Sequence, residues 1–598
     1  MTTRFRWATA LLFLALALVF FGQDPTEARH RPWRGPHVTE DGWYYWHWLR
    51  SAAFDGDLDL SNDYREFGNW YGFGSTPTGK PHNPFGIGPA LLWAPGFALG
   101  HAVARLGAPA VVANGYSAPE QAGALATSFL ASLGAFLFGF ALCRRFTGER
   151  TAWLATALAY LGSPLVWYAL YSPAMPHAFE ACFGAAFLWS ALPLRERRMP
   201  DALALGLITG GMLLVRPQLV VLLALPVVEA ARAIQLRRKL APPLLALGLV
   251  VLVALAVNTP QLWVWKSVYG RWLLIPQGPG FLRFDASLWS ETLFSSRNGL
   301  FTSTPLLWLT LPGLVVLTHR QRSLGAVLVG AFALQAFVNG AVWDWWGGGA
   351  FGGRRYLASF PIWALSIAAL ADAFAAPGRL VRARVGLAAL VTSGLLWLQW
   401  RLVRAHHSHS FSWEASVPFP ERMRVASAGS WPLNPFAFPA NAWFALRHGV
   451  PLAQYDFAVG PYLLDERLPT TNPLLPRKRA EGVDLSRPES RGFLGRGFSR
   501  AACGAALEQP AGELFVPLNR PGALTLEVEV EVEGTWSFNG RTLGPGTRWR
   551  IDAASVERGL NVLRVESAGD RRGCVRRLQL TEGTEWPPPW ATVYERSP

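Results

Sequence analysis

The stretch from His37 to Pro84 reads HVTEDGWYYWHWLRSAAFDGDLDLSNDYREFGNWYGFGSTPTGKPHNP and separates a short apolar segment from a long series of apolar segments. Acidic residues are scarce elsewhere in the apolar half of the chain, and this stretch contains a large share of them. Its first acidic pair, Glu40-Asp41, lies just past the first apolar segment. A carboxylate held ionised at a membrane surface is suited to act as a general base.

The same acidic pair also has a purely structural interpretation. Thr39 is a suitable N-cap for a helix that starts here, because its hydroxyl can accept a hydrogen bond from an unsatisfied backbone amide. Asp41 would then lie in the first turn, where the helix dipole favours a carboxylate. The local sequence leaves both interpretations open, and it does not decide between Glu40 and Asp41 as the base.

The composition is typical of a polytopic membrane protein. Of the 598 residues, 51% are hydrophobic and only 16% are charged. The chain contains 28 Trp, which cluster near the ends of apolar segments as in the aromatic belts of membrane proteins. Outside the C-terminal region, the Arg residues behind the net charge of +15 lie mostly in short loops between apolar segments. This pattern indicates membrane topology, and the sequence contains no nucleic-acid-binding motif.

Apolar segments separated by basic clusters predict an α-helical membrane domain with about eleven transmembrane helices. Arg4 and Arg6 precede the first segment, which puts the N-terminus in the cytoplasm and His37–Pro84 outside. A cleaved signal peptide is the alternative for that first segment. The apolar stretch Gly86–Leu106 is interrupted by two prolines and is expected to form helices lying in the outer interface. The later spans are expected at Gln121–Leu142, Thr151–Tyr171, His177–Leu194, Leu203–Val215, Arg216–Ala233, Pro242–Val257, Gly299–Leu317, Leu324–Val342, Tyr356–Ala376 and Val385–Trp400.

The pattern changes after the membrane domain, which is expected to cover residues 1–401. Residues 402–490 are rich in Pro, Trp and Phe without helical periodicity, and we expect them to lie along the outer membrane face. Residues 491–598 include the alternating run LTLEVEVEVE and the hairpin signal Asn539-Gly540, which predict a C-terminal β-sandwich outside the membrane. An oxidising compartment would permit a disulfide between Cys503 and Cys574, with two buried thiols as the alternative.

Polar residues gather in the loops predicted to face outside, as an active site on one face of the membrane requires. Transfer of a group from a lipid phosphate needs a base for the attacking hydroxyl and cations for the phosphate. Asp41 suits the first role, and Lys80, Arg354 and Arg355 suit the second because Arg presents paired donors to phosphate oxygens. Further candidates for the substrate pocket are His82, His177, Arg283 and Asp344.

These features resemble the GT-C superfamily of integral-membrane glycosyltransferases, in the branch with protein O-mannosyltransferases and the aminoarabinose transferase of lipid A. The resemblance covers roughly residues 4–401 and rests on an acidic motif opening the first outer loop, here TEDGWYYWHWLRS, and on a Lys-Pro motif, here GKPHNPFG. It implies a polyprenyl-phosphate sugar donor, a reaction at the outer face, Asp41 as the base and Lys80 as a phosphate contact. By loop position it also implies roles for His177 and for Arg354 or Arg355.

Two residues depart from the family pattern. The acidic pair is Glu-Asp followed by Gly42, where the family more often has Asp-Glu, so Glu40 stays open as the base. The Lys-Pro motif continues with His82 where the family has a second Pro, which weakens the assignment of Lys80.

The acidic loop also matches part of a calcium-binding template, which raises a divalent cation as a candidate ligand. Leu60, however, occupies the position where the template needs Gly for a sharp turn. A solvated acidic turn is the alternative. The template ligands would be Asp55, Asp57, Asp59, Asp63 and Glu66.

We therefore expect an inverting glycosyltransferase that moves a sugar from a polyprenyl-phosphate donor to a hydroxyl of a glycan, lipid or protein, with no nucleic-acid partner. The expected location is the bacterial inner membrane, with the β-sandwich extracytoplasmic. A transporter or flippase of lipid-linked sugars is the main alternative, and it would place charges within the spans, which are nearly free of them. A lipid-linked glycan ligase or polymerase shares the donor chemistry and is a further alternative.

Overall fold

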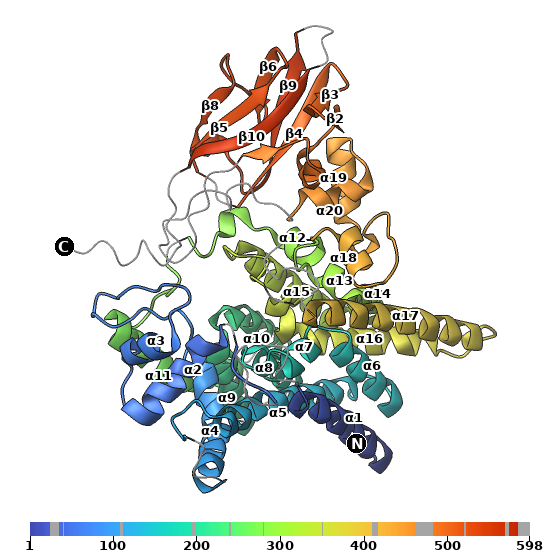
Figure 1. The fold of residues 1–598 in the computed structure, drawn as a ribbon. Coiled ribbons are helices and arrows are strands. Elements are labelled where there is room, and N and C mark those ends of the chain that lie inside the picture. Colours follow the sequence, from blue (N-terminus) through green and yellow to red (C-terminus); the bar gives the residue numbers. More distant parts are fainter. Residues whose placement is uncertain are drawn as a thin grey trace.

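The computed structural model describes residues 1–23, 35–39, 41–107, 112–192, 199–237, 241–278, 280–349, 351–408, 417–460, 482–519, 522–568 and 573–583. Within these ranges a bundle of helices occupies one side of the molecule and two β-sheets stack at the other (Figure 1). The predicted combination of a helical membrane domain with a C-terminal β-sandwich is confirmed.

In the described part of the chain, six helical segments are long and apolar enough to cross a membrane. Their lipid-facing character is visible in leucines that point away from the protein, such as Leu252 at 65% and Leu390 at 71% exposed. Helices satisfy their own backbone hydrogen bonds, which a bilayer core requires. The protein is thus an integral membrane protein. The six segments are α1 (Thr3–Phe21), α5 (Ala118–Cys143), α11 (Ala241–Tyr269), α15 (Arg322–Ala341), Arg354–Phe374 with η7 (Arg354–Ser359) and α16 (Phe360–Phe374), and α17 (Val381–His407).

The remaining apolar segments of the bundle are shorter or broken helices, so the count of about eleven spans stays a prediction. Breaks fall at Pro164, Pro176 and the Arg216–Pro217 pair, because proline lacks the amide that continues a helix. The segments concerned are α6 (Glu149–Leu161), α7 (Leu165–Leu170), α8 (His177–Ala191), α9 (Met199–Val215), η4 (Pro217–Leu223), α10 (Ala224–Arg237), η6 (Pro305–Leu309) and α14 (Thr310–Arg320).

The stretch predicted as separate proline-broken helices is one continuous helix, α4 (Gly88–Gly107), which contains Pro95. It packs along α5 through glycines, and a Cβ on Gly96 would lie 2.2 Å from the carbonyl oxygen of Gly123. Small residues allow this close approach of two backbones. The prediction of separate helices was wrong because close packing against α5 supports the helix across Pro95.

Residues 402–490 contain helices that their sequence periodicity does not reveal. Prolines stand at or just before the start of two of these helices, where a missing amide costs nothing, and they obscured the pattern. The lack of helical periodicity therefore did not mean a lack of helices, and the position of this stretch along the outer membrane face stays a prediction. The helices are the end of α17, α18 (Phe419–Val425), α19 (Ala440–His448) and α20 (Tyr455–Ala458).

Within the described residues, the β-sandwich consists of a six-stranded and a four-stranded antiparallel sheet, and the first described strand starts at Val483, before the predicted boundary at residue 491. Leu526 and Val528 point inward and are buried, while Glu527 between them is partly exposed and Glu529 after them is exposed, as the period of two predicts. Cys503 and Cys574 form a disulfide bond. One sheet contains β1 (Val483–Asp484), β2 (Phe498–Ala501), β3 (Gly504–Leu507), β5 (Leu524–Val530), β8 (Arg548–Ile551) and β10 (Cys574–Gly583); the other contains β4 (Ala511–Leu518), β6 (Gly534–Phe538), β7 (Arg541–Thr542) and β9 (Gly559–Ser567).

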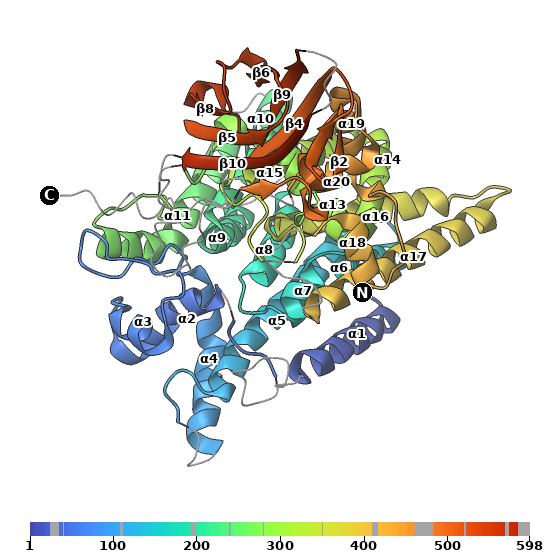
Figure 2. The ribbon, with the colours of Figure 1, turned by 45° about the horizontal axis from the view of Figure 1, so that its top comes forward.

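The sandwich lies over the ends of α15 and α19 in both views (Figure 1 and Figure 2). Its Phe515 ring contacts Phe444 of α19 with a centroid separation of 5.5 Å. The hairpin between β6 and β7 turns at Asn539 and Gly540, both with positive φ, as the Asn-Gly pair predicts.

Candidate active site

Asp41 directs its carboxylate away from the helix that follows it. The residue stands at the N-cap position of α2 (Gly42–Arg50), yet its side chain makes no capping hydrogen bond there. Oδ1 instead accepts a hydrogen bond from the Tyr71 hydroxyl at 2.5 Å, and Oδ2 lies 3.6 Å from Nη1 of Arg354. The prediction that Thr39 caps this helix through its hydroxyl was wrong, because α2 begins at Gly42 and Thr39 contributes its backbone carbonyl. The carboxylate is therefore not used to cap the helix, and its partners are Tyr71 and Arg354.

Buried aromatic side chains of α2 fix the position of Asp41. The indole of Trp46 donates to the carbonyl of Gly115 at 3.0 Å, and that of Trp48 donates to the carbonyl of Phe85 at 2.8 Å. At the start of the helix, a Cβ on Gly42 would lie 2.5 Å from the Cβ of Ala174. The glycine thus lets α2 begin against the segment that leads into α8.

Arg354 and Arg355 stand at the end of a glycine-rich loop after α15, which we call the arginine loop (residues 342–355, with residue 350 outside the described ranges). Arg355 donates to both the backbone carbonyl and the carboxylate of Asp344, each at 2.6 Å. Its own carbonyl accepts from Gln335 and Asn339 of α15 at 3.0 and 3.2 Å. The candidates Asp344 and Arg355 are thus one unit, in which the carboxylate orients the guanidinium.

Glycine is required where the arginine loop passes Arg354. Gly347 and Gly348 both adopt positive φ, and a Cβ on Gly347 would lie 3.2 Å from Nε of Arg354. A larger residue there would press on the guanidinium, so the glycines set the space in which Arg354 lies beside Asp41.

A third arginine completes the site. Nδ1 of His177 lies 2.9 Å from Glu180 Oε2, and Nε2 lies 3.1 Å from Nη2 of Arg216. Because a guanidinium can only donate, the network assigns a neutral His177 that accepts at Nε2 and donates from Nδ1 to Glu180. Arg216 Nε is also 3.6 Å from the Glu180 carboxylate. The buried imidazole therefore orients Arg216.

The three guanidiniums form one electrostatic site. The charges of Arg216, Arg354 and Arg355 all act on the His177 ring, and those of Arg216, Arg354 and Asp41 act on the buried Tyr45. Burial and the neighbouring Asp41 carboxylate raise the pKa of Tyr71, so its hydroxyl stays protonated and donates. Such a cluster can hold a phosphate between guanidiniums and present one carboxylate to a hydroxyl.

Sequence reasoning missed Tyr71, Glu180 and Arg216. The one available signal was the spacing of His177 and Glu180, which puts both side chains on the same face of α8. Glu40, the alternative base, lies outside the described residues.

The structure does not bring the other candidates into this cluster. Lys80 donates from Nζ to Ser267 of α11 at 2.9 Å, and its contacts in the described part of the chain do not reach Asp41. His82 is only 1% exposed, and burial lowers its pKa to about 3, so it is a packed core residue. Arg283 pairs with the neighbouring Asp285 at 2.9 Å, on the side of the β-sandwich.

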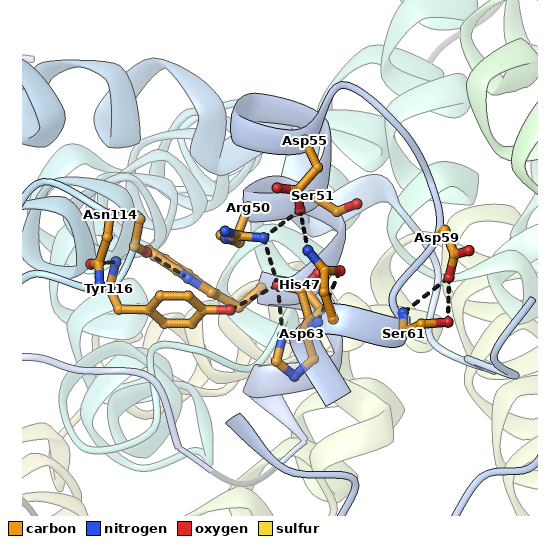
Figure 3. A network of polar contacts seen from close by, with 12 residues as sticks. His47, Arg50, Ser51, Asp55, Asp59, Ser61, Asp63, Asn114 and Tyr116 are labelled. Atoms are coloured by element: carbon orange, nitrogen blue, oxygen red, sulfur yellow. Dashed lines mark hydrogen bonds and ion pairs between the residues drawn. The ribbon is translucent and has the colours of Figure 1, made fainter. Parts of the chain in front are cut away.

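The acidic loop does not assemble a calcium site (Figure 3). In the described part of the chain, no three His, Cys, Asp or Glu side chains are grouped to hold a metal ion. A helix, α3 (Ser61–Phe67), forms where the template needs a loop, and Leu60 is fully buried. The candidate ligands instead make local contacts: Asp55 with Arg50 and Asn62, Asp57 with Ser51, Asp59 with Ser61, and Asp63 with Arg50 and Tyr116, while Glu66 is exposed.

Comparison with known proteins gives similarity at the level of fold. No protein-family model and no curated protein matches the sequence. The chain is similar to the structure of ArnT from Cupriavidus metallidurans bound to undecaprenyl phosphate, at a TM-score of 0.40 and 14% identity over 68% of this chain and 70% of that one. It is also similar to the apo oligosaccharyltransferase of Archaeoglobus fulgidus, at a TM-score of 0.40 and 14% identity over 73% of this chain and 61% of that one. The structure of apo ArnT from Cupriavidus metallidurans matches at a TM-score of 0.38 and 15% identity, over 78% of this chain and 82% of that one.

Proposed function

We propose that the protein is a membrane glycosyltransferase that moves a sugar from a polyprenyl-phosphate donor to an acceptor hydroxyl. The observation that carries this proposal is the position of the Asp41 carboxylate between the Tyr71 hydroxyl and the Arg354 guanidinium. A carboxylate at a helix start that caps no amide, and lies among arginines, suits a base beside a phosphate site.

In the proposed reaction, the donor phosphate binds to Arg354 with Arg216 and Arg355 nearby. Arg354 then shares its donors between the phosphate and Asp41, and the carboxylate becomes free to accept a proton. The acceptor hydroxyl gives its proton to Asp41, and its oxygen forms a bond to the anomeric carbon. The bond from that carbon to the phosphate oxygen breaks, and the polyprenyl phosphate leaves with the electron pair. Attack opposite the leaving group inverts the anomeric configuration.

The proposal places the site at the outer face of a bacterial inner membrane. This is supported by the basic clusters in the loops predicted to be cytoplasmic and by the disulfide in the β-sandwich, which suits an oxidising compartment. We assign Lys80 to fixing its loop against α11, because its ammonium donates to Ser267 while Thr78 donates to the carbonyl of Val268 at 2.6 Å.

The test uses the purified protein in proteoliposomes with a panel of hexosyl and pentosyl polyprenyl phosphates. Glycan, lipid and peptide hydroxyls are offered as acceptors, and release of polyprenyl phosphate and product configuration are measured. Release that requires both a donor and an acceptor, with an inverted product, is expected. Movement of intact donor between leaflets without release would overturn the proposal in favour of a flippase.

A further inference from the structure

One guanidinium of the β-sandwich binds a row of carbonyls at the end of a membrane helix. Arg558 precedes β9, and its Nη1 donates to the carbonyls of Ala286 at 3.1 Å and Gly340 at 3.2 Å. Its Nη2 donates to the carbonyls of Val342 at 2.8 Å and Trp343 at 3.1 Å. These acceptors lie at and just beyond the C-terminus of α15 and in the outer loop before α12 (Trp289–Phe294).

The chemistry of this contact is specific. The last carbonyls of a helix have no partners within the helix and carry the negative end of its dipole, so a cation is favoured there. Arg558 is only 8% exposed, and burial lowers its pKa to about 10, so it stays charged at neutral pH. Asn519 supports it, with Oδ1 accepting from Nε of Arg558 at 3.2 Å and Nδ2 donating to the carbonyl of Trp343 at 2.9 Å.

Two of the bound carbonyls, those of Val342 and Trp343, lie at the start of the arginine loop. The residue after Trp343 is Asp344, whose carboxylate and carbonyl hold the Arg355 guanidinium. Arg355 follows Arg354, the partner of Asp41, and both residues belong to the first turn of η7. The path from Arg558 to the proposed phosphate site therefore consists of backbone contacts at one end of the loop and an ion pair at the other.

We propose that Arg558 is a positioning residue, through which the β-sandwich holds the start of the arginine loop so that Arg354 and Arg355 face the donor phosphate. The role assigned to the loop rests on the proposed function. The contact of Arg558 with the carbonyls does not depend on that function. The experiment therefore measures hydrogen exchange of the loop separately from the activity.

The experiment compares wild type with Arg558→Ala, Arg558→Lys and Asn519→Ala. Arg564→Ala is the matched control, since Arg564 is an exposed arginine of the same sandwich that pairs with Glu566. Hydrogen exchange of residues 342–355 is measured in nanodiscs, together with kcat and the KM for donor and acceptor. Lysine keeps the charge but cannot bridge several carbonyls, so it keeps the test valid if the alanine variant does not fold.

The expected result for Arg558→Ala is exchange in the arginine loop that is faster by roughly tenfold, with a donor KM raised by several-fold and an unchanged acceptor KM. Arg558→Lys should give intermediate values, and Arg564→Ala should match wild type. A merely structural role would lower kcat through loss of active protein without changing the donor KM. Wild-type loop exchange and donor KM in Arg558→Ala would overturn the proposal, while absence of transfer by wild type would overturn the proposed function and leave the exchange result valid.

Discussion

Nη1 of Arg354 lies 3.6 Å from Oδ2 of Asp41, and both side chains are largely buried, at 13% and 15% exposed. The two residues come from the first polar loop and from the loop after α15, which are far apart in sequence. Since a donor phosphate would attract the same guanidinium, Asp41 and the phosphate compete for Arg354. The pair therefore links occupancy of the donor site to the availability of the base.

The competition makes Arg354 the most sensitive cation of the site. Arg354→Lys should lower kcat/KM for the donor by about 100-fold, because a lysine ammonium cannot serve a carboxylate and a phosphate with paired donors. The measurement is steady-state transfer with polyprenyl phosphate binding by tryptophan fluorescence. Arg65→Ala, in the exposed part of the first loop, is the control. Unaltered donor kinetics in the lysine variant would remove Arg354 from the phosphate site.

Tyr71 orients the proposed base. Tyr71→Phe should reduce kcat by roughly tenfold and leave the donor affinity unchanged, since the lost hydrogen bond goes to a charged carboxylate and not to the phosphate. Single-turnover transfer with saturating donor measures this effect. An increase in donor KM without any change in kcat would show instead that the hydroxyl contacts the donor.

The buried Asp63 predicts a pH dependence of stability. Burial raises the pKa of this carboxyl to about 6, although Tyr116 and Arg50 lower it in part. The folded state therefore binds the proton more tightly than the unfolded state, and the contribution of Asp63 to stability falls as pH rises from about 4 to about 6. The unfolding temperature of wild type minus that of Asp63→Asn should therefore be highest at pH 4 and lowest at pH 7.5.

The comparison with Asp63→Asn is needed because His47, in the same network, acts in the opposite direction. Burial lowers its pKa to about 4, so its contribution to stability increases with pH between about 4 and 6.5. Thermal unfolding of both proteins in detergent between pH 4 and 7.5 separates the two effects. A constant temperature difference over this range would contradict the burial of a titrating Asp63.

The disulfide should stabilise the β-sandwich. It joins residues 71 positions apart, and closing a loop of that length removes chain entropy worth roughly 4 kcal/mol from the unfolded state. Cys503→Ser should therefore destabilise the sandwich. The measurement is the hydrogen-exchange protection of strands β5, β9 and β10 as the temperature is raised, and this protection should be lost at a lower temperature in the variant. Cys182→Ser is the control, because Cys182 is a free thiol in a helix of the membrane domain. Equal protection in both variants would show that the bond adds no stability.

The sequence predicted those residues of the proposed site that lie in the loops between apolar segments. These residues are charged side chains in polar loops between apolar helices, so they stand out in the sequence: Asp41, Asp344, Arg354 and Arg355. The alternation of apolar and polar residues predicted the strands of the sandwich, since the face of each sheet that packs on the other sheet must be apolar.

The residues that were missed depend on tertiary contacts. Glu180 lies on a mostly apolar helix, and Arg216 looked like an ordinary basic residue beside a proline. Lys80 and His82 lie outside the cluster around Asp41 because the turn that carries them packs on α11. The Thr76 and Thr78 hydroxyls of this turn both donate to the carbonyl of Val268 at 2.6 Å. The spacing of a motif does not show toward which helix it turns.

The central claim is that Asp41 takes the proton of the acceptor hydroxyl. The most direct test preloads wild type, Asp41→Asn and Asp59→Asn with donor in nanodiscs, adds acceptor, and follows a single turnover of polyprenyl phosphate release. Asp59 is a partly exposed carboxylate of the same loop, and it accepts a hydrogen bond from Ser61. We predict that Asp41→Asn binds donor as tightly as wild type or more tightly, because Arg354 loses its competitor, and that it releases polyprenyl phosphate at least about 1,000-fold more slowly. Release at the wild-type rate by donor-loaded Asp41→Asn would contradict the account.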